Sequence, residues 1–553
     1  MSFYKSQANQ SDIPLTSPNY KVPDMARDTP RNKKNRNCCY RYKWWWVALV
    51  VLILALGITA CVLLLAVKPP ALMHALGLDY MLPAGKSNGD VLDDSIPFKD
   101  STKTLPPNPS VAPNLKLVPK DLGSFDDNAS PNDMVPSLDQ GFPYGSTPIR
   151  GVNLGGWLVL EPFLSHSLFS KYSSSDNIID EWTLLKKLGK KDGFDVMKDH
   201  YDTFLTEDHI KKIKEVGINH VRIPVGYWMI DINDDEPFVY GSWEYLLRGI
   251  QWCRKYGIRV LIDFHAAPGS QNGWNHSGRS GDRNFLSSKN GNNEELVTRF
   301  VGIVRKTQKY FSTPQWKNVV TMIGVLNEPF PDPKNNKEFD MLTDFYKKVQ
   351  TELRNDVPLE DGPWLTYSDG FQQIDRWNSA LNKTSFPKSA LDIHDYVAFS
   401  PDVYKLDQSK IANIPCEAWR TKYKNSKAHL AMTVTGEFSA AVNDCGIYLN
   451  GVKLGSRLNG DFDYPSLNGD NNAKPCTNCE CYKYTNYGNY TTEFKGFLKK
   501  FVERQMETFE AGGGGWFFWN FRTQDNLSPA WDFLLGVEQG WIPNDVNKRE
   551  NSC

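Results

Sequence analysis

The chain has 553 residues, too many for one ordinary domain, although a single barrel with long loops can absorb most of them. Its 40% hydrophobic and 23% charged residues are typical of a globular protein and argue against a wholly disordered one. The formal net charge of −1 argues against nucleic-acid binding, which needs a basic surface to displace counterions.

The first 67 residues are predicted to form a cytoplasmic tail and a membrane anchor. Residues 1–43 are polar and without apolar period, so we expect disorder. Residues 44–67 carry no charge and are long enough for a helix to cross ~30 Å of hydrocarbon. Basic residues precede this run and mainly acidic residues follow it, which predicts a single-pass type II protein of the plasma membrane with an extracellular C-terminal part. A cleaved signal peptide is the weaker alternative, because the run starts far from the N-terminus.

Residues 68–140 are predicted to be an extended extracellular stalk. They contain eleven prolines and only three aromatic residues, a composition that cannot build a core. Such a stalk would hold the following domain away from the bilayer.

Residues 141–553 alternate short apolar runs with amphipathic helical patterns. The helical patterns include residues 207–217, 294–311, 338–353 and 493–513. Apolar strands that alternate with helices call for a parallel sheet, and eight of them predict an α/β fold, the (β/α)₈ or TIM barrel. The eight predicted strands begin at Ile149, His220, Arg259, Val319, Trp364, Ala390, Leu430 and Gly515.

Seven cysteines follow the predicted membrane segment, where an oxidising environment permits disulfides. The odd number leaves at least one thiol outside an intramolecular pair, and Cys253, in an amphipathic segment, is expected to be a buried core thiol. The run CTNCEC at 476–481 is interpreted as disulfide chemistry rather than a zinc site, because no second ligand pair follows. Five sequons agree with an extracellular domain: Asn128, Asn275, Asn382, Asn489 and Asn526.

Polar and aromatic residues recur where the predicted strands end, which in a barrel is where the βα loops gather. Polar residues also simply mark where a strand leaves the core, but the choice of Arg, His, Glu and Trp favours a functional site. These residues are Arg222 at the end of the second strand, Asp263 and His265 at the end of the third, Asn327 and Glu328 at the end of the fourth, His394 and Tyr396 at the end of the sixth, Glu437 at the end of the seventh and Trp519 near the end of the eighth.

Two of these residues, Glu328 in VLNEPF and Glu437 in VTGEFS, match the needs of glycoside hydrolysis, which uses two carboxyl groups across the scissile bond. We expect Arg222 and Tyr396 to hold Glu437 ionised and to lower its pKa. Glu328, with less cationic support, is expected to keep the higher pKa that an acid needs. For either glutamate alone a structural salt bridge explains the residue better; the matching positions favour catalysis.

NEP after the fourth strand and GEF after the seventh resemble the family 5 glycoside hydrolases. Longer segments are similar to fungal exo-β-1,3-glucanases, from roughly Ile149 to Cys553: GVNLGGWLVLEP (151–162), VRIPVGYW (221–228), DFHAAPGSQNGW (263–274), HDYVAF (394–399) and DCGIYLNG (444–451). The resemblance implies a retaining enzyme that needs no metal or other cofactor and releases glucose from the non-reducing end of β-1,3-glucan in the cell wall. We expect a monomer whose partners are glucan and, through its anchor, the bilayer.

The resemblance also implies roles for individual residues. Glu328 falls on the acid/base position and Glu437 on the nucleophile position. The supporting positions are Arg222, His265, Asn327, His394 and Tyr396. The positions that bind sugar are Glu161 for the terminal glucose, Trp519 as the platform beneath it, and Trp274 with Phe399 as a pair of rings on the leaving-group side. The implied disulfides are Cys416–Cys553 and a bond from Cys445 to one of Cys476, Cys479 and Cys481.

Some features depart from the family pattern. The loop after Trp274 reads NHSGRSG, with a sequon at Asn275, and the end of strand eight reads WNFRTQ without the usual carboxylate. These departures bear on the exo preference more than on the chemistry. The alternatives are a β-glucan transglycosylase or a β-1,6- or β-1,4-glucanase on the same barrel, and a catalytically idle glucan-binding protein of the wall.

Overall fold

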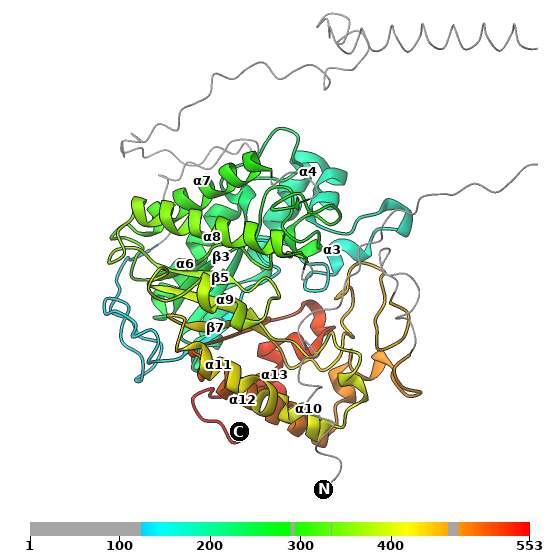
Figure 1. Cartoon of the computed structure of the whole chain (residues 1–553). Coiled ribbons are helices and arrows are strands. Elements are labelled where there is room, and N and C mark those ends of the chain that lie inside the picture. Colours follow the sequence, from blue (N-terminus) through cyan, green and yellow to red (C-terminus); the bar gives the residue numbers. More distant parts are fainter. Residues whose placement is uncertain (1–122, 289–292, 333–334, 463–473) are drawn as a thin grey trace, which may run out of the picture. The chain divides into compact units, whose positions relative to one another are not determined.

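The computed structural model describes residues 123–288, 293–332, 335–462 and 474–553 (Figure 1). The predicted tail 1–43, the predicted membrane segment 44–67 and residues 68–122 of the predicted stalk lie outside this range. Within it, none of the helices has both the length and the apolar character that crossing a bilayer requires.

Eight parallel strands form a closed barrel in chain order, which confirms the predicted fold. The barrel closes where β1 pairs with β8, with Ile149 opposite Gly515. Several strands are buried at every position, as expected of a sheet that has helices outside and packed side chains inside. The strands are β1 (Ile149–Asn153), β2 (His220–Gly226), β3 (Arg259–Ala266), β4 (Val320–Gly324), β5 (Trp364–Ser368), β6 (Ser389–His394), β7 (Thr433–Phe438) and β8 (Gly513–Phe518).

Helices surround the barrel, and the four helical patterns read from the sequence correspond to α5, α7, α8 and α12 (Figure 1). The longest helix, α4, was not among the predictions. Its N-terminus is capped by Asp180, which accepts from Thr183, but Gly189 interrupts the helical backbone with a φ of 74°. The helices are α3 (Ser167–Ser170), α4 (Glu181–Phe204), α5 (Glu207–Glu215), α6 (Ser242–Lys255), α7 (Glu294–Phe311), α8 (Asn336–Asp356), α9 (Ile374–Ala380), α10 (Gln408–Ile414), α11 (Arg420–Ser426), α12 (Thr492–Glu510) and α13 (Phe533–Gln539).

The segment that precedes β1 covers the N-terminal end of the barrel. Val135 and Phe142 are buried there in a small apolar cluster with the first residue of β1. The hydroxyl of Tyr144 donates to Thr321 Oγ1 at 2.7 Å, and Arg259 at the start of β3 donates to the carbonyl of Gln140 at 2.9 Å. This segment therefore forms a floor beneath the strands.

Contacts with the barrel begin before the predicted domain boundary at residue 141. Phe125 packs edge-on against Trp316, with ring centroids 5.4 Å apart. Asp127 forms an ion pair with Arg254 at the end of α6 and accepts from Asn318. The described part of the predicted stalk, residues 123–140, is thus packed on the domain that follows it.

Three disulfides join the cysteines of the described residues. Cys416 pairs with Cys553, as the resemblance implied. Cys445 pairs with Cys481, which is one of the three partners that the resemblance implied for it. Cys476 instead pairs with Cys479. Cys253 is buried and free, which confirms its predicted place in the core.

Candidate active site

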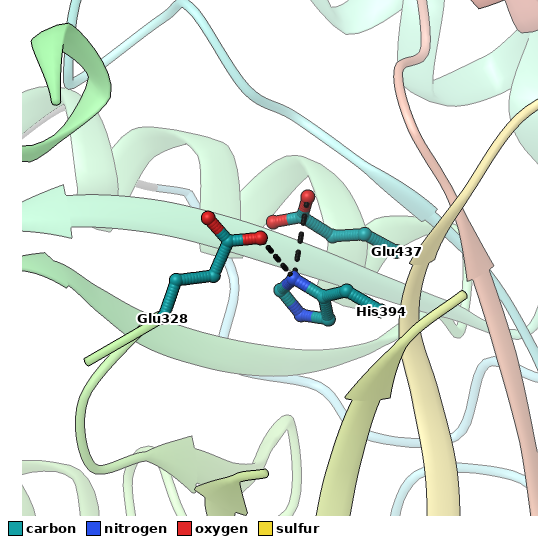
Figure 2. A group of neighbouring side chains, drawn as sticks. All are labelled: Glu328, His394 and Glu437. Atoms are coloured by element: carbon teal, nitrogen blue, oxygen red, sulfur yellow. Dashed lines mark hydrogen bonds and ion pairs between the residues drawn. The ribbon is translucent and has the colours of Figure 1, made fainter. Parts of the chain in front are cut away.

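The two predicted glutamates lie together at the C-terminal end of the barrel. Glu437 is the fifth residue of β7, and Glu328 follows the end of β4 by four residues. One oxygen of each carboxylate and one nitrogen of His394 all lie within 4.8 Å of one another. Figure 2 shows the imidazole of His394 between the two carboxylates. The barrel therefore brings together two acids that are 109 positions apart in the sequence.

Both oxygens of Glu437 are held by donors. Arg222 Nη1 lies 2.9 Å from Oε1, and the hydroxyl of Tyr396 donates to Oε2 at 3.0 Å. The side chain of Glu437 is only 7% exposed. These contacts confirm the two partners that we predicted for Glu437 and fix the plane of its carboxylate.

Arg222 lies deeper than predicted. It is the third of the seven residues of β2, rather than its last, and its side chain is completely buried. Its Nη2 lies 3.1 Å from Asp263 and 3.9 Å from Asp392, so Glu437 is one of three carboxylates around this guanidinium. Arg222 also donates to Asn327 Oδ1 at 2.7 Å, which orients that amide within the site. It thereby joins residues of several strands.

Glu328 is bordered by two imidazoles. His394 Nδ1 lies 2.7 Å from Oε1, and His276 Nε2 lies 3.4 Å from Oε2. The side chain is 12% exposed, more than that of Glu437. Its backbone has a φ of 43°, in the left-handed region, and Asn272 donates to its carbonyl at 3.1 Å. Such a conformation costs about 1–3 kcal/mol and persists where the surroundings over-determine it.

The predicted order of the two glutamate pKa values is wrong for this structure. Burial raises the pKa of Glu437 to about 7, against the opposing charges of His394 and Arg222. Burial also disfavours the charged form of Glu328, but the hydrogen bond and the charge of His394 are among the causes that lower its pKa to about 2. The prediction failed because Arg222 divides its charge among three carboxylates, whereas Glu328 has His394 as a close cationic partner.

His394 carries the positive charge between the glutamates. Burial opposes protonation, but the charges of Glu437 and Asp392 and the hydrogen bond to Glu328 raise the pKa of His394 well above 6.5. Glu328, His394 and Glu437 also have the spacing of three metal ligands. A metal-bound imidazole must be deprotonated at the ligating nitrogen. The environment that holds His394 as a cation therefore suits proton transfer better than metal binding.

Three further predicted residues, His265, Trp519 and Glu161, lie next to one another in the site. His265 Nδ1 lies 2.9 Å from Asp263 Oδ2, and the ring of His265 stacks on Trp519, with centroids 5.5 Å apart and planes at 8°. Trp519 directly follows β8, as predicted, and is 3% exposed. Glu161 lies 3.8 Å from His265 Nε2, and burial together with the charges of Glu437 and Glu328 raises its pKa well above 4.5. These surroundings therefore disfavour the charged form of Glu161.

The predicted pair of rings on the leaving-group side belongs to two separate aromatic groups. Trp274 packs against Phe330 and Phe371, with centroids 5.4 and 5.5 Å away. Phe399 packs against Tyr396 at 5.9 Å and Trp531 at 6.0 Å. The first group adjoins Glu328 through the chain, since Phe330 is two residues beyond it, and the second adjoins Glu437 through Tyr396.

Sequence reasoning missed several residues of this site. Asn153 accepts from Arg222 Nη1 at 3.0 Å, and Asp392 adds its charge to the centre of the barrel. Both lie inside strands that are predicted to be apolar, although the segments GVNLGG and LDIHDY contain these polar residues. His276 lies in the loop NHSGRSG, directly after the sequon asparagine Asn275, and not at the end of a predicted strand. Of the sequon asparagines, Asn128 and Asn489 are exposed, and Asn275, Asn382 and Asn526 are partly buried.

Comparison with known proteins agrees with this geometry. Residues 187–452, which include both glutamates, match the profile of Cellulase (glycosyl hydrolase family 5). Proteins named probable glucan 1,3-β-glucosidase D are similar: that of Aspergillus fumigatus is 39% identical over 430 residues, covering 76% of this chain and 50% of that protein. That of Aspergillus niger is 38% identical over 442 residues, covering 78% and 51%.

The chain therefore spans about half the length of the curated relatives it matches. Among solved structures, the rutinosidase from Aspergillus niger aligns with a TM-score of 0.53 at 18% identity, covering 72% of this chain and 98% of that one. At this identity the likeness shows a common fold, which agrees with the closed barrel and with the family 5 profile.

Proposed function

We propose that this protein is a retaining β-glycosidase of family 5 that acts on β-1,3-glucan. The observation that carries the proposal is the separation of the two carboxylates, whose nearest oxygens lie within 4.8 Å. Retaining enzymes hold their carboxyl groups ~5–5.5 Å apart, whereas inverting enzymes need ~6.5–9.5 Å to admit a water. A short gap with fixed orientation supports nucleophilic attack by one of the two acids.

The contacts of the two glutamates support their different roles. Glu437 has both oxygens held by Arg222 and Tyr396, which suits a nucleophile that must approach the anomeric carbon in one orientation. Glu328 is more exposed and lies 2.7 Å from a protonated imidazole, which suits a group that must give and later take a proton. The acid is then the pair of Glu328 and His394, which share one proton.

The reaction has two steps. A Glu437 oxygen bonds to the anomeric carbon while the bond to the departing oxygen breaks, and Glu328 delivers to that oxygen the proton it shares with His394. A water then attacks the anomeric carbon, Glu328 accepts the proton of that water, and the ester to Glu437 breaks with retained configuration. A sugar hydroxyl in place of water gives transglycosylation.

The proposed substrate rests on the sugar-binding surfaces and on the relatives. Trp519, backed by His265, offers a flat ring beside the catalytic pair, and Glu161 supplies a polar group next to it. The relatives named probable glucan 1,3-β-glucosidase support β-1,3-glucan as the substrate. We propose that glucose is released from its non-reducing end. Product analysis on laminarin, pustulan and cellulose separates this activity from β-1,6- and β-1,4-glucanase activity, and oligosaccharides longer than the substrate would reveal a transglycosylase.

Trapping of the glycosyl-enzyme tests the mechanism. A 2-deoxy-2-fluoro-β-glucoside with a good leaving group should label Glu437, and peptide mapping should find the label there. A label on any other residue would overturn the assignment. Equal hydrolysis by the wild type, Glu437→Gln and Glu328→Gln would instead favour an idle glucan-binding protein.

We further propose that residues 44–67 anchor the enzyme in the plasma membrane and that the barrel works outside the cell, on wall glucan. The charge asymmetry around this apolar run and the sequons of the following domain support the proposal. Full-length protein should resist carbonate extraction from membranes and lose mass on treatment with an N-glycosidase. Release of the intact chain by carbonate would contradict the anchor.

A further inference from the structure

His276 lies in a short turn that is built to hold it in place. The turn η5 (Asn275–Ser277) follows β3 and its loop, and Gly278 N donates to the carbonyl of Asn275 at 3.0 Å. The buried hydroxyl of Ser277 lies 2.7 Å from the carbonyl of Trp274 and 2.7 Å from the hydroxyl of Ser270. Both flanks of the turn are therefore fixed.

Two rings further confine the imidazole. Its centroid lies 5.5 Å from that of Trp274 and 5.4 Å from that of His265. Nε2 of His276 lies 3.4 Å from Oε2 of Glu328, so the ring lies between these two aromatic side chains and the proposed acid/base. The opposite oxygen of Glu328 is the one that meets His394.

The hydrogen-bonding state of His276 follows from its buried Nδ1. Among the residues described, none forms a hydrogen bond with this atom. An unpaired buried N–H donor costs about 1–3 kcal/mol, so the tautomer with its proton on Nε2 and a bare Nδ1 is favoured. In this tautomer the proton lies on Nε2, the nitrogen that is 3.4 Å from Glu328 Oε2.

The charged groups around His276 agree with the neutral form. Burial, together with the positive charges of His394 and Arg222, lowers its pKa, and the negative charges of Glu328 and Asp263 only partly oppose this. His265, on the other side of the ring, is itself held neutral because burial and the charge of Arg222 lower its pKa well below 6.5. In its neutral form, His276 can therefore donate a hydrogen bond to Glu328 only through Nε2–H.

We propose that His276 is a positioning residue for the acid/base: its Nε2–H holds Oε2 of Glu328, so that Oε1 faces His394. This inference rests on the proposed function, in which Glu328 protonates the departing oxygen. A donor on Oε2 stabilises the carboxylate that remains after proton transfer, and so makes Glu328 a stronger acid. It also prevents rotation of the carboxyl group between the two protonation steps.

A pair of variants of similar size separates donation from packing. His276→Gln places an amide N–H near the position of Nε2, whereas His276→Leu fills the space without a donor. Each is assayed, in the full-length protein, on phenyl β-D-glucoside, whose leaving group needs a proton, and on 2,4-dinitrophenyl β-D-glucoside, whose leaving group does not. His429→Leu, at an exposed position outside the site, is the control for loss of a histidine.

We expect His276→Leu to lower kcat/KM about tenfold on the phenyl glucoside, the value of one hydrogen bond to a charged group, and less than about twofold on the dinitrophenyl glucoside. The basic limb of its pH profile should move to higher pH, because the acid becomes weaker. His276→Gln should recover most of the loss and return the limb toward the wild-type position. His429→Leu should match the wild type on both substrates.

Equal losses on the two substrates with an unmoved pH profile would overturn the proposal and leave His276 a packing residue. If His276→Leu does not fold by its thermal denaturation curve, His276→Met takes its place in the same comparison. Glu328→Ala distinguishes a failure of the proposal on His276 from a failure of the proposed function. If Glu328 is the acid/base, this variant should lose activity selectively on the phenyl glucoside. If Glu328→Ala does not discriminate between the substrates, the role of Glu328 is itself wrong, and the inference on His276 fails with it.

Discussion

Tyr396→Phe tests whether Glu437 depends on its two donors. The substitution removes the hydroxyl that donates to Oε2 at 3.0 Å and keeps the ring that packs against Phe399 and Trp531. The pKa of Tyr396 is raised well above 10 by burial and by the charges of Glu437 and Glu328, so the hydroxyl is a neutral donor at working pH. Only one hydrogen bond to a charged group is therefore lost.

Such a bond contributes about 1.5–3 kcal/mol, so kcat/KM should fall by about 10- to 150-fold. The sign of the pH effect is also determined. The hydroxyl favours the carboxylate form of Glu437, so its loss raises the pKa of Glu437, and the acidic limb of kcat/KM moves to higher pH. The assay is the pH dependence of kcat/KM on 2,4-dinitrophenyl β-D-glucoside, which isolates the nucleophilic step.

Tyr367→Phe is the matched control. Tyr367 lies in β5, is buried, and donates to Gln350 of α8 at 2.7 Å, outside the site. Its loss should lower the free energy of unfolding by about 1 kcal/mol and leave kcat/KM within about twofold. A loss of less than about threefold for Tyr396→Phe, or an unmoved acidic limb, would refute the reasoning on Glu437.

Other outcomes follow from the same structure. The acidic limb of kcat/KM for the wild type should lie well above pH 4.5, because Glu437 must be ionised and burial raises its pKa to about 7; a limb at the ordinary glutamate value would contradict this. Gly155→Ala should raise KM, since the new Cβ would lie 2.5 Å from the ring of Trp519 and would displace it. An unchanged KM would show that substrate binding tolerates this displacement. Cys416→Ser should destabilise the fold by about 2–4 kcal/mol in denaturant titrations, because the bond to Cys553 closes a loop of 137 residues, while a midpoint equal to that of the wild type would deny the bond a role.

The sequence predicts the barrel well because its strands are almost continuous apolar runs. The eight predicted strands all appear, and the two glutamates lie where strand-end reasoning placed them. Helix α4 escaped prediction because Gly189 breaks its period, although Asp180 and Thr183 form a recognisable cap.

The electrostatics of the site could not be read from the chain. Strand-end positions predict that Arg222 pairs with Glu437. The number of carboxylates around Arg222, however, depends on which side chains of three other strands point into the barrel. The same holds for His394, whose position between Glu328 and Glu437 reverses the expected pKa order. Pairings within CTNCEC were likewise open, because three cysteines so close in sequence are equally near to Cys445 until the loop is folded.

Residues 123–148 cover the N-terminal end of the barrel, and they determine on which side of the barrel the chain enters the domain. The chain reaches the domain at Phe125 and Asp127, against Trp316 and Arg254, at the end of the barrel opposite Glu328 and Glu437. The described chain therefore begins on the side of the barrel away from Glu328 and Glu437. Protein coupled to a support through this side should keep Glu328 and Glu437 accessible to a large substrate.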